Sequence, residues 1–244
     1  MHFHRVKVIY GGDGMIIEGI ATNIQDVHDL NRFGADRIEL CSGMEQDGLT
    51  PAMALVKEAV EASSIPINVM IRPHDLSFRY TDREVMQMED QIREVGSYGA
   101  NGIVIGALAE DGRIDANALE SFISICGEMD ITFHKAFDAL DDQVEGLKML
   151  FKYPEVKTIL TSGGPGGVTD NFGKLQKLMK KTEGTHITIM PGGGLNTDNV
   201  TEMVEKLKPE SLHFGTGIRS FKSYEAGISG EKLAFIRSAG RNRR

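Results

Sequence analysis

The chain has few of the features that mark secreted, membrane-bound or nucleic-acid-binding proteins. It carries a net charge of −8 and no concentrated basic face. Nucleic-acid backbones bind such basic faces, so we expect no nucleic-acid partner. No apolar run approaches the roughly 18 residues that span a membrane, and the first residues lack the apolar core of a signal peptide. We therefore expect a cytoplasmic protein with no membrane association.

Cysteine is scarce, and the chain has no stretch with the composition of a flexible linker. Cys41 and Cys126, the two cysteines among 244 residues, lie on a predicted strand end and a predicted helix, so we expect no structural disulfide. No Pro- or Ser-rich stretch divides the chain, and its length matches the roughly 250 residues of a single (β/α)₈ barrel. We predict one domain over residues 15–240. Residues 1–14 are predicted to form an N-terminal extension or a strand across the barrel floor, and residues 241–244 a basic tail.

Short aliphatic runs alternate with amphipathic helical stretches along the whole chain. Eight runs have the length and composition of strands: 15–21, 36–42, 67–72, 102–108, 130–138, 158–164, 186–194 and 211–217. Helical patterns cover 23–34, 51–62, 82–99 and 115–128, and several begin with a capping residue. This alternation predicts an α/β fold, a (β/α)₈ TIM barrel. A doubly wound sheet is the alternative, but its glycine fingerprint comes early, whereas here the glycine clusters come late.

Polar side chains occupy strand positions that the alternation of strand faces directs into the barrel. In 36–42, for example, Ile38 and Leu40 are predicted to face the helices, which leaves Glu39 and Cys41 inside. The same reasoning applied to the other strands gives six ionisable interior residues: Glu18, Glu39, Arg72, His134, Asp138 and His213. Buried charges must pair with each other, bind a ligand or become neutral. A structural network in which Arg72 bridges carboxylates is one interpretation, and a functional site at the strand ends is the other.

Glycine clusters follow the last three strands, where many barrels bind phosphate through backbone N–H groups. The predicted anion-binding residues are Ser162, Gly163, Gly164, Gly192, Gly193, Gly194, Gly215 and Thr216. Glycines also form tight turns, so a purely structural role stays open. The alternation turns Lys135 away from the interior.

Several of these segments together resemble the CutC family of copper homeostasis proteins, over residues 15–217. They are GADRIELCSGMEQDGLTP, NVMIRP, GANGIVIGAL, ITFHKAFD, ILTSGG and IMPGGGLNTDN. The resemblance implies a (β/α)₈ barrel, a cytoplasmic location, self-association into a homodimer or higher homo-oligomer, and a role in copper handling. Two positions depart from the family pattern: Lys135 stands where relatives have Arg, and the segment after His213 differs.

Copper(I) binding in the family is attributed to a cysteine pair on the first two strands. Cys41 matches the second cysteine, and the first falls at Gly19. Cys41 is therefore the expected metal ligand, with Met70 and His134 as further soft or borderline candidates. A free cysteine is also commonly a small buried apolar residue.

Two functional hypotheses follow. The resemblance implies a CutC-like protein of copper homeostasis that binds copper(I). The ionisable interior instead favours a lyase-, isomerase- or aldolase-like enzyme acting on a small anionic or phosphorylated metabolite. In that enzyme Arg72 would orient the anion and Glu39 or His134 would act as general base, with Asp138 or Glu18 tuning the pKa of that base.

Overall fold

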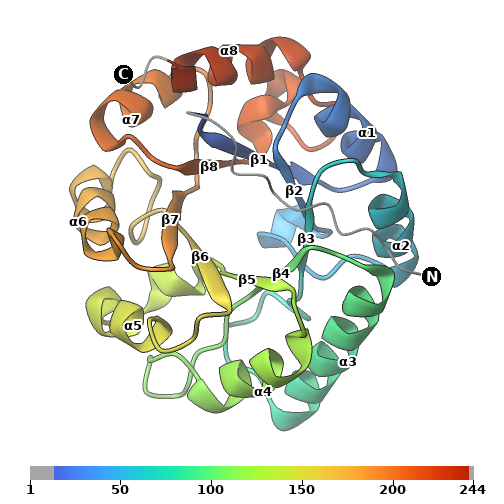
Figure 1. The fold of residues 1–244 in the computed structure, drawn as a ribbon, viewed down its shortest axis with the longest axis vertical. Helices are drawn as coiled ribbons and strands as arrows, with labels where there is room; N and C mark the ends of the chain where they lie inside the picture. The colour runs from blue at the N-terminus through green and yellow to red at the C-terminus, as the bar shows by residue number, and fades with distance from the viewer. Residues whose placement is uncertain (1–13, 242–244) are drawn as a thin grey trace.

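The computed structural model describes residues 14–241 and shows a ring of parallel strands enclosed by helices (Figure 1). The eight strands of this region are β1 (Ile16–Ala21), β2 (Arg37–Leu40), β3 (Ile67–Met70), β4 (Gly102–Ile105), β5 (Asp130–Phe133), β6 (Val156–Thr161), β7 (Thr188–Pro191) and β8 (Ser211–Phe214). From β1 to β7 each strand pairs in parallel with the next, and β1 pairs with β8. A parallel bridge between Gly192 and His213 joins the remaining edges. The predicted (β/α)₈ barrel is confirmed.

A helix follows every strand and covers the outside of the ring. These helices are α1 (Ile24–Phe33), α2 (Met53–Ala62), α3 (Asp82–Tyr98), α4 (Ala116–Cys126), α5 (Gln143–Leu150), α6 (Phe172–Thr182), α7 (Val200–Leu207) and α8 (Gly230–Arg241). Local sequence explains their ends. Asn23 caps α1 by accepting from the Asp26 amide, and Gly34 ends it with a φ of 81°. Thr81 and Glu84 form a reciprocal capping box at the start of α3.

The strands are shorter than predicted, and short 3₁₀ helices take over part of their length. The clearest correction concerns the fifth strand, which was predicted over 130–138. β5 ends at Phe133, and η2 (Lys135–Ala139) follows it directly. Similar turns are η1 (Met44–Gln46), η3 (Thr216–Ile218) and η4 (Ser220–Lys222). Strand alternation therefore does not apply beyond His134.

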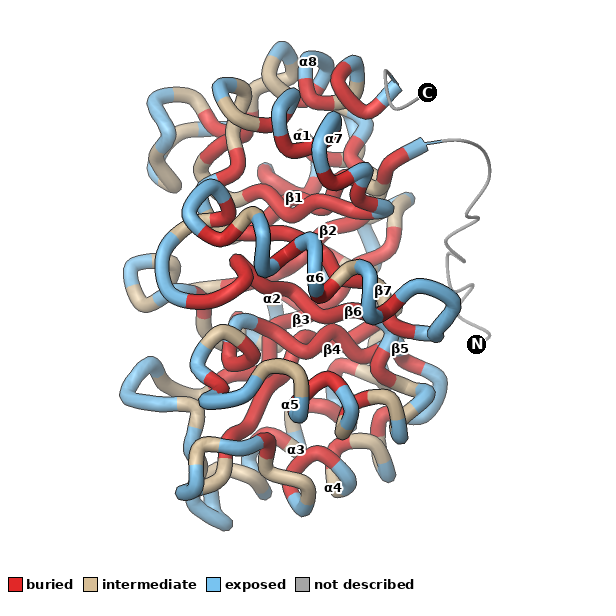
Figure 2. The backbone as a smooth tube through the Cα atoms, turned by 90° about the vertical axis from the view of Figure 1, so that its left-hand side faces the viewer, coloured by how far each residue is buried: buried red, intermediate tan, exposed pale blue. Residues whose placement is uncertain are grey.

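The core has two parts, on the two sides of the barrel wall. The larger part lies between the strands and the helices, and Figure 2 shows the buried strands at the centre with exposed residues on the outer helix faces. The smaller part lies near the carboxyl ends of the first four strands and contains Ile20, Cys41, Met70 and Val104. Neither Cys41 nor Cys126 forms a disulfide, as predicted. The inward-facing groups at this end are thus a mixture of apolar, sulfur-bearing and charged side chains.

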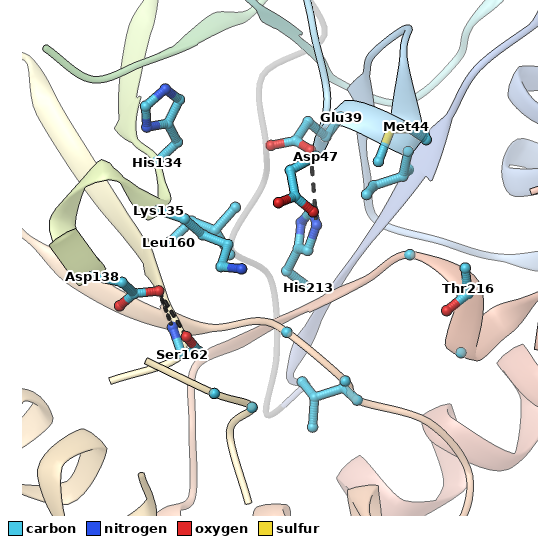
Figure 3. A pocket seen from close by; sticks show the side chains of 18 of the residues that line it. Glu39, Met44, Asp47, His134, Lys135, Asp138, Leu160, Ser162, His213 and Thr216 are labelled. Atoms are coloured by element: carbon cyan, nitrogen blue, oxygen red, sulfur yellow. Dashed lines mark hydrogen bonds and ion pairs between the residues drawn. The ribbon is translucent and has the colours of Figure 1, made fainter. Parts of the chain in front are cut away.

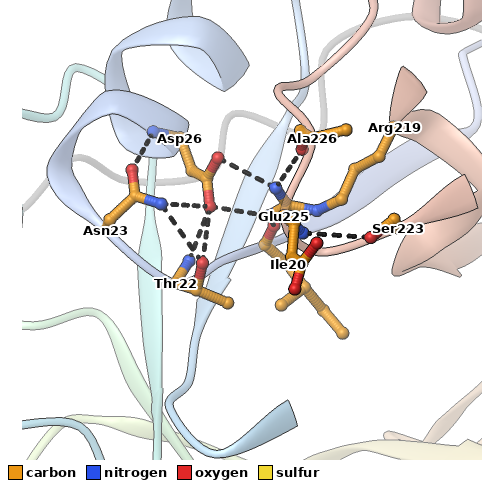
Figure 4. Close-up of polar contacts among 8 residues, drawn as sticks. All are labelled: Ile20, Thr22, Asn23, Asp26, Arg219, Ser223, Glu225 and Ala226. Atoms are coloured by element: carbon orange, nitrogen blue, oxygen red, sulfur yellow. Dashed lines mark hydrogen bonds and ion pairs between the residues drawn. The ribbon is translucent and has the colours of Figure 1, made fainter. Parts of the chain in front are cut away.

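A buried ion pair links the first helix to the loop after β8. Arg219, 1% exposed, donates from Nη2 to Asp26 Oδ2 at 2.6 Å and from Nη1 to Asp26 Oδ1 at 3.1 Å. The guanidinium also donates to the carbonyls of Ile20 and Ala226 (Figure 4). It lies 5.0 Å from the centroid of the Tyr224 ring. These contacts hold the β8 loop in place beside the end of β1.

In the described part of the chain, no helix combines the length and apolar character needed to cross a bilayer. The predicted extension or floor strand over residues 1–14 lies outside the described residues except for Gly14. The predicted basic tail lies outside them except for Arg241.

Candidate functional site

A chain of buried charged groups crosses the barrel interior from β2 to β1 and β8. Arg37 Nε forms a short ion pair with Glu18 Oε2, and the Nδ1–H of His213 donates to Glu18 Oε1 at 2.7 Å. His213 Nε2 lies 3.8 Å from Glu39 Oε2. We call these four residues the ion-pair chain. The interior placement predicted for Glu18, Glu39 and His213 is correct.

The members of the ion-pair chain shift one another's pKa values in opposite directions. Burial alone would raise the pKa of Glu18, but Arg37 and His213 outweigh it and lower that pKa to about 2. Burial opposes the charging of His213, yet Glu39 and Glu18 outweigh it and raise the pKa of the imidazole. Burial and the nearby Glu18 raise the pKa of Glu39. Glu39 is therefore the carboxyl group of this chain that most readily holds a proton.

Three of these residues also approach the geometry of a metal site. One ligand atom from each of Glu18, Glu39 and His213 lies within 4.8 Å of the others, so the group could hold a cation. However, both carboxylate oxygens of Glu18 are already engaged, one by Arg37 and one by His213. The fixed positive charge of Arg37 supplies the charge compensation that a cation would otherwise provide.

Cys41 lies beside this chain, fully buried, and its thiol donates to Glu39 Oε2 at 3.2 Å. Burial raises the pKa of this thiol well above its ordinary value, and Glu39 raises it further. Two methionines approach the same point from neighbouring segments. A Cβ atom placed on Gly48 would lie 3.8 Å from Cys41 Sγ, 3.8 Å from Met44 Sδ and 3.6 Å from Met70 Cε. We call Cys41, Met44 and Met70 the sulfur cluster.

The residue of the first strand that packs with Cys41 is Ile20, not Gly19, and in the β1–β2 register Ile20 pairs with Glu39. A Cβ atom on Gly19 would point outward and meet Leu30 Cδ2 at 2.5 Å. Ile20 instead packs in the interior cluster that contains Cys41 and Met70. A cysteine at residue 19 would face the helix layer. It could not lie beside Cys41, so residue 19 is not the position of a cysteine partner for Cys41.

Arg72 and His134 lie on the β3 and β5 side of the barrel, apart from the ion-pair chain. One interpretation of the sequence had Arg72 bridging carboxylates. In the structure Arg72 forms no ion pair with a described carboxylate. Its Nη1 donates to the backbone carbonyls of Gln46 and Gly48 at 2.9 and 3.0 Å. Arg37, on the same face of β2 as Glu39, pairs with the buried carboxylate of Glu18.

Asp138 reaches the site from η2 rather than from the inner face of a strand. Its carboxylate accepts from Thr161 Oγ1, from Ser162 Oγ at 2.7 Å and from the Ser162 amide at 3.0 Å. These contacts join η2 to the end of β6. Asp138 therefore positions the β6 loop, and its carboxylate forms no hydrogen bond or ion pair with His134 in the described structure.

The glycine clusters divide into cavity-lining and packing positions. Ser162, Gly164, Gly193, Gly194, Gly215 and Thr216 line a common cavity. Gly163 and Gly192 do not line it: a Cβ on Gly163 would meet Asn171 Cβ at 2.8 Å, and one on Gly192 would meet Leu160 Cδ1 at 2.5 Å. Within residues 14–241, the backbone N–H groups of Gly193 and Gly194 donate no hydrogen bond. These two amides are candidate donors to a bound anion.

Many of these residues line one cavity of about 760 Å³ at the carboxyl ends of the strands, where active sites of this fold lie. Figure 3 shows Glu39, Met44 and His213 on one side and His134, Asp138 and Ser162 on the other. Lys135, predicted to face away, is exposed and lines the cavity because η2 begins there. Neither Glu18 nor Cys41 lines it; both lie deeper.

Sequence reasoning missed several residues of the site. Arg37 shares the strand face of Glu39 and Cys41, so the alternation that placed those two could have found it. Met44 begins the three-residue helix η1 and Phe78 lies on a loop, and neither segment carries a periodic signal. Lys222 lines the cavity from η4 and was likewise outside any strand pattern.

Comparison with known proteins identifies the family. The profile described as the CutC family matches residues 15–218. The chain belongs to the CutC family. A human copper homeostasis protein cutC homolog is 37% identical over 201 residues, which cover 82% of this chain and 73% of the human protein. A CutC family protein of Enterococcus faecalis is 38% identical over 211 residues, covering 84% of this chain and 100% of that protein.

Solved structures agree with this assignment. A CutC copper homeostasis protein from Streptococcus agalactiae superposes with a TM-score of 0.76 at 27% identity, covering 82% of this chain and 98% of that one. Phosphoribosylanthranilate isomerase from Pyrococcus furiosus gives a TM-score of 0.62 at 13% identity, covering 93% and 99%. The second likeness concerns the barrel fold alone.

Proposed function

We propose that this CutC family protein binds copper(I) as cargo at the sulfur cluster and acts in copper homeostasis, the role named for its relatives. The observation that carries the proposal is the convergence of Cys41, Met44 and Met70 on one point beside Gly48. Thiolate and thioether ligands favour copper(I) over harder ions. Met44 and Met70 also line the cavity, which gives the ion a route to the buried Cys41.

Copper(I) binding at this cluster requires the Cys41 proton to leave, because the free protein holds a neutral thiol. As the copper–sulfur bond forms, the S–H bond breaks and its proton passes to a base. Glu39 Oε2 already accepts the hydrogen bond from Cys41 Sγ at 3.2 Å, so it is placed to take this proton. The copper affinity should therefore increase with pH.

An anaerobic copper(I) titration against a competing chelator tests the proposal. Cys41→Ser should weaken binding by about tenfold or more, and Met70→Leu should weaken it less, because thioethers bind more weakly than a thiolate. Cys126→Ser is the matched control, since Cys126 is the second buried cysteine and lies on α4, outside the lining of the cavity. If Cys41→Ser binds copper(I) as tightly as wild type, this function is wrong.

A second candidate function, proton transfer on a small anionic metabolite, is favoured by Glu39. Its Oε1 atom is buried without a hydrogen-bond partner among the described residues, and the side chain lines the cavity beside His213. In this enzyme Glu39 would act as the base, Glu18 would orient His213 and the amides of Gly193 and Gly194 would hold the anion. Incubation with phosphorylated sugars and keto acids in deuterated water should then exchange a carbon-bound proton, and Glu39→Gln should abolish the exchange. Absence of exchange across the panel would contradict this candidate.

Two family expectations accompany these proposals. We propose self-association into a homodimer or higher homo-oligomer, to be checked by light scattering across a range of protein concentrations. We also propose a cytoplasmic location, to be checked by cell fractionation. A concentration-independent monomer, or recovery in another fraction, would reject the respective expectation.

A further inference from the structure

Two polar atoms on the β3 and β5 side of the cavity are buried without any hydrogen-bond partner among residues 14–241. They are Arg72 Nε and His134 Nε2, on side chains that line the cavity and belong to residues 6% and 3% exposed. Leaving a buried polar group unpaired costs free energy, and the cost is larger when the group is charged. Both atoms are therefore free to donate to a bound acceptor; the Tyr80 hydroxyl lies near Arg72 but is likewise without a hydrogen bond among these residues.

The hydrogen bonds of His134 determine which of its ring nitrogens carries the proton. The amide of Ala136 donates to His134 Nδ1 at 3.1 Å, so the lone pair of Nδ1 is occupied. Burial, and then the charge of Arg72, lower the pKa of His134 to about 3, so the ring is neutral near pH 7. The remaining proton lies on Nε2, which makes this atom a donor.

Arg72 brings a positive charge that no described carboxylate neutralises. The two hydrogen bonds of its Nη1 go to neutral backbone carbonyls, at Gln46 and Gly48. Its guanidinium lies 5.0 Å from the ring centroid of Phe78, and the ring of His134 lies 5.1 Å from the same ring. Arg72 and His134 thus share Phe78 as an apolar neighbour, and Phe78 also lines the cavity.

We propose that Arg72 and His134 form a subsite for an oxyanion, the carboxylate or phosphate group of a small molecule bound in the cavity. Arg72 Nε–H and His134 Nε2–H donate to the oxygens, and Phe78 forms the apolar wall. His134 is then a neutral donor and not the general base considered from the sequence. The inference deepens the second candidate function by naming its substrate class, and it is independent of copper binding.

The test uses metal-free wild-type protein with a chelator present, titrated separately with acetate and with inorganic phosphate. Nuclear magnetic resonance of ¹⁵N-labelled histidine should show the Nε2–H tautomer of His134, and this resonance should shift on addition of at least one anion. A response to acetate alone identifies a carboxylate subsite, and a response to phosphate alone a phosphate subsite. If neither anion moves the resonance, or if an anion binds and leaves it unmoved, the subsite does not exist.

Variants separate the two donors from general electrostatics. Arg72→Met and His134→Phe should each weaken anion binding by about tenfold or more, because each removes a donor that a buried anion needs. His134→Gln should retain most of the affinity, since the Gln amide can donate from a similar place. Arg93→Met, on the exposed face of α3, is the matched charge control and should have no effect. Equal binding by Arg72→Met and wild type would overturn the subsite.

The same proteins distinguish failure of this inference from failure of the proposed functions. Cys41→Ser should lose copper(I) affinity and keep anion binding, whereas Arg72→Met should do the reverse. Deuterium exchange by Glu39 can also fail while the anion still binds. A variant that alters both affinities equally would show that the two sites are not independent and would contradict the assignment.

Discussion

His213 Nδ1 lies 2.7 Å from Glu18 Oε1, and the other oxygen of the same carboxylate pairs with Arg37. Glu18 is fully buried, so its charge depends on both neighbours. The arrangement fixes the orientation of the imidazole and directs Nε2 toward Glu39 and the cavity. A carboxylate that orients a histidine in this way is common in both catalytic and structural sites.

Removal of Arg37 should strongly destabilise the barrel. We expect Arg37→Met to lower the free energy of unfolding by about 3–5 kcal/mol, because it leaves Glu18 buried with much less compensation. The double variant Arg37→Met with Glu18→Gln should recover part of this loss, since the uncompensated charge is gone. Urea unfolding of the two single variants and the double variant measures the coupling. Strictly additive effects would mean that the pair is not coupled.

A second stability prediction concerns the ion pair between Arg219 and Asp26, which lies near the paired strands β1 and β8. Arg219→Met should cost about 3–5 kcal/mol, because Asp26 and the carbonyls of Ile20 and Ala226 lose a buried donor. Arg93→Met, which removes an exposed ion pair, should cost less than about 1 kcal/mol. Thermal unfolding compares the two. A similar small loss in both variants would show that the Arg219–Asp26 ion pair contributes little to the free energy of unfolding.

Strand alternation located Glu18, Glu39 and His213 because these residues lie within regular strands, where side chains strictly alternate, and it located Cys41 because this residue directly follows β2. Asp138 also lines the cavity, but the rule does not explain its position, because the chain leaves the strand after Phe133 and turns into η2. Alternation carries no information once the backbone becomes helical. The glycine clusters were recognised by composition, but composition does not separate Gly193, on the cavity, from Gly192, which packs against Leu160.

The contacts of residues on irregular segments could be found only from the folded structure. Met44 reaches the sulfur cluster only because η1 folds back over the end of β2, with Gly48 at a φ of 91°. Arg72 is held by carbonyls of that same loop. Nothing in the spacing of these residues predicts such contacts, since they depend on the path of an irregular segment.

The geometry of the first strand predicts how a second thiolate could be introduced. Ile20→Cys should place a thiol beside Cys41 and raise the copper(I) affinity by about tenfold or more, because two thiolates hold copper(I) better than one. Gly19→Cys should not raise it, because its side chain would point at Leu30, and it should destabilise the fold. Parallel chelator competition and urea unfolding of both variants check this. A gain in affinity at residue 19 but not at residue 20 would contradict the assigned strand faces.

His134 should make the stability of the protein depend on pH. Its pKa is about 3 in the folded protein against an ordinary 6.5, so between these values the unfolded chain binds more protons and acid favours unfolding. The stability that the neutral ring provides is complete above pH 6.5 and is lost as the pH falls toward 3. We expect the difference in free energy of unfolding between wild type and His134→Gln to shift by about 2 kcal/mol against wild type between pH 7.5 and pH 5. Urea unfolding of both proteins at the two pH values measures this shift.

The comparison with His134→Gln cancels the contributions of Glu18, Glu39 and His213, which both proteins share. An unchanged difference would mean that His134 accepts a proton as readily in the folded protein as in the unfolded chain, and the neutral donor assigned to the oxyanion subsite would be lost with it.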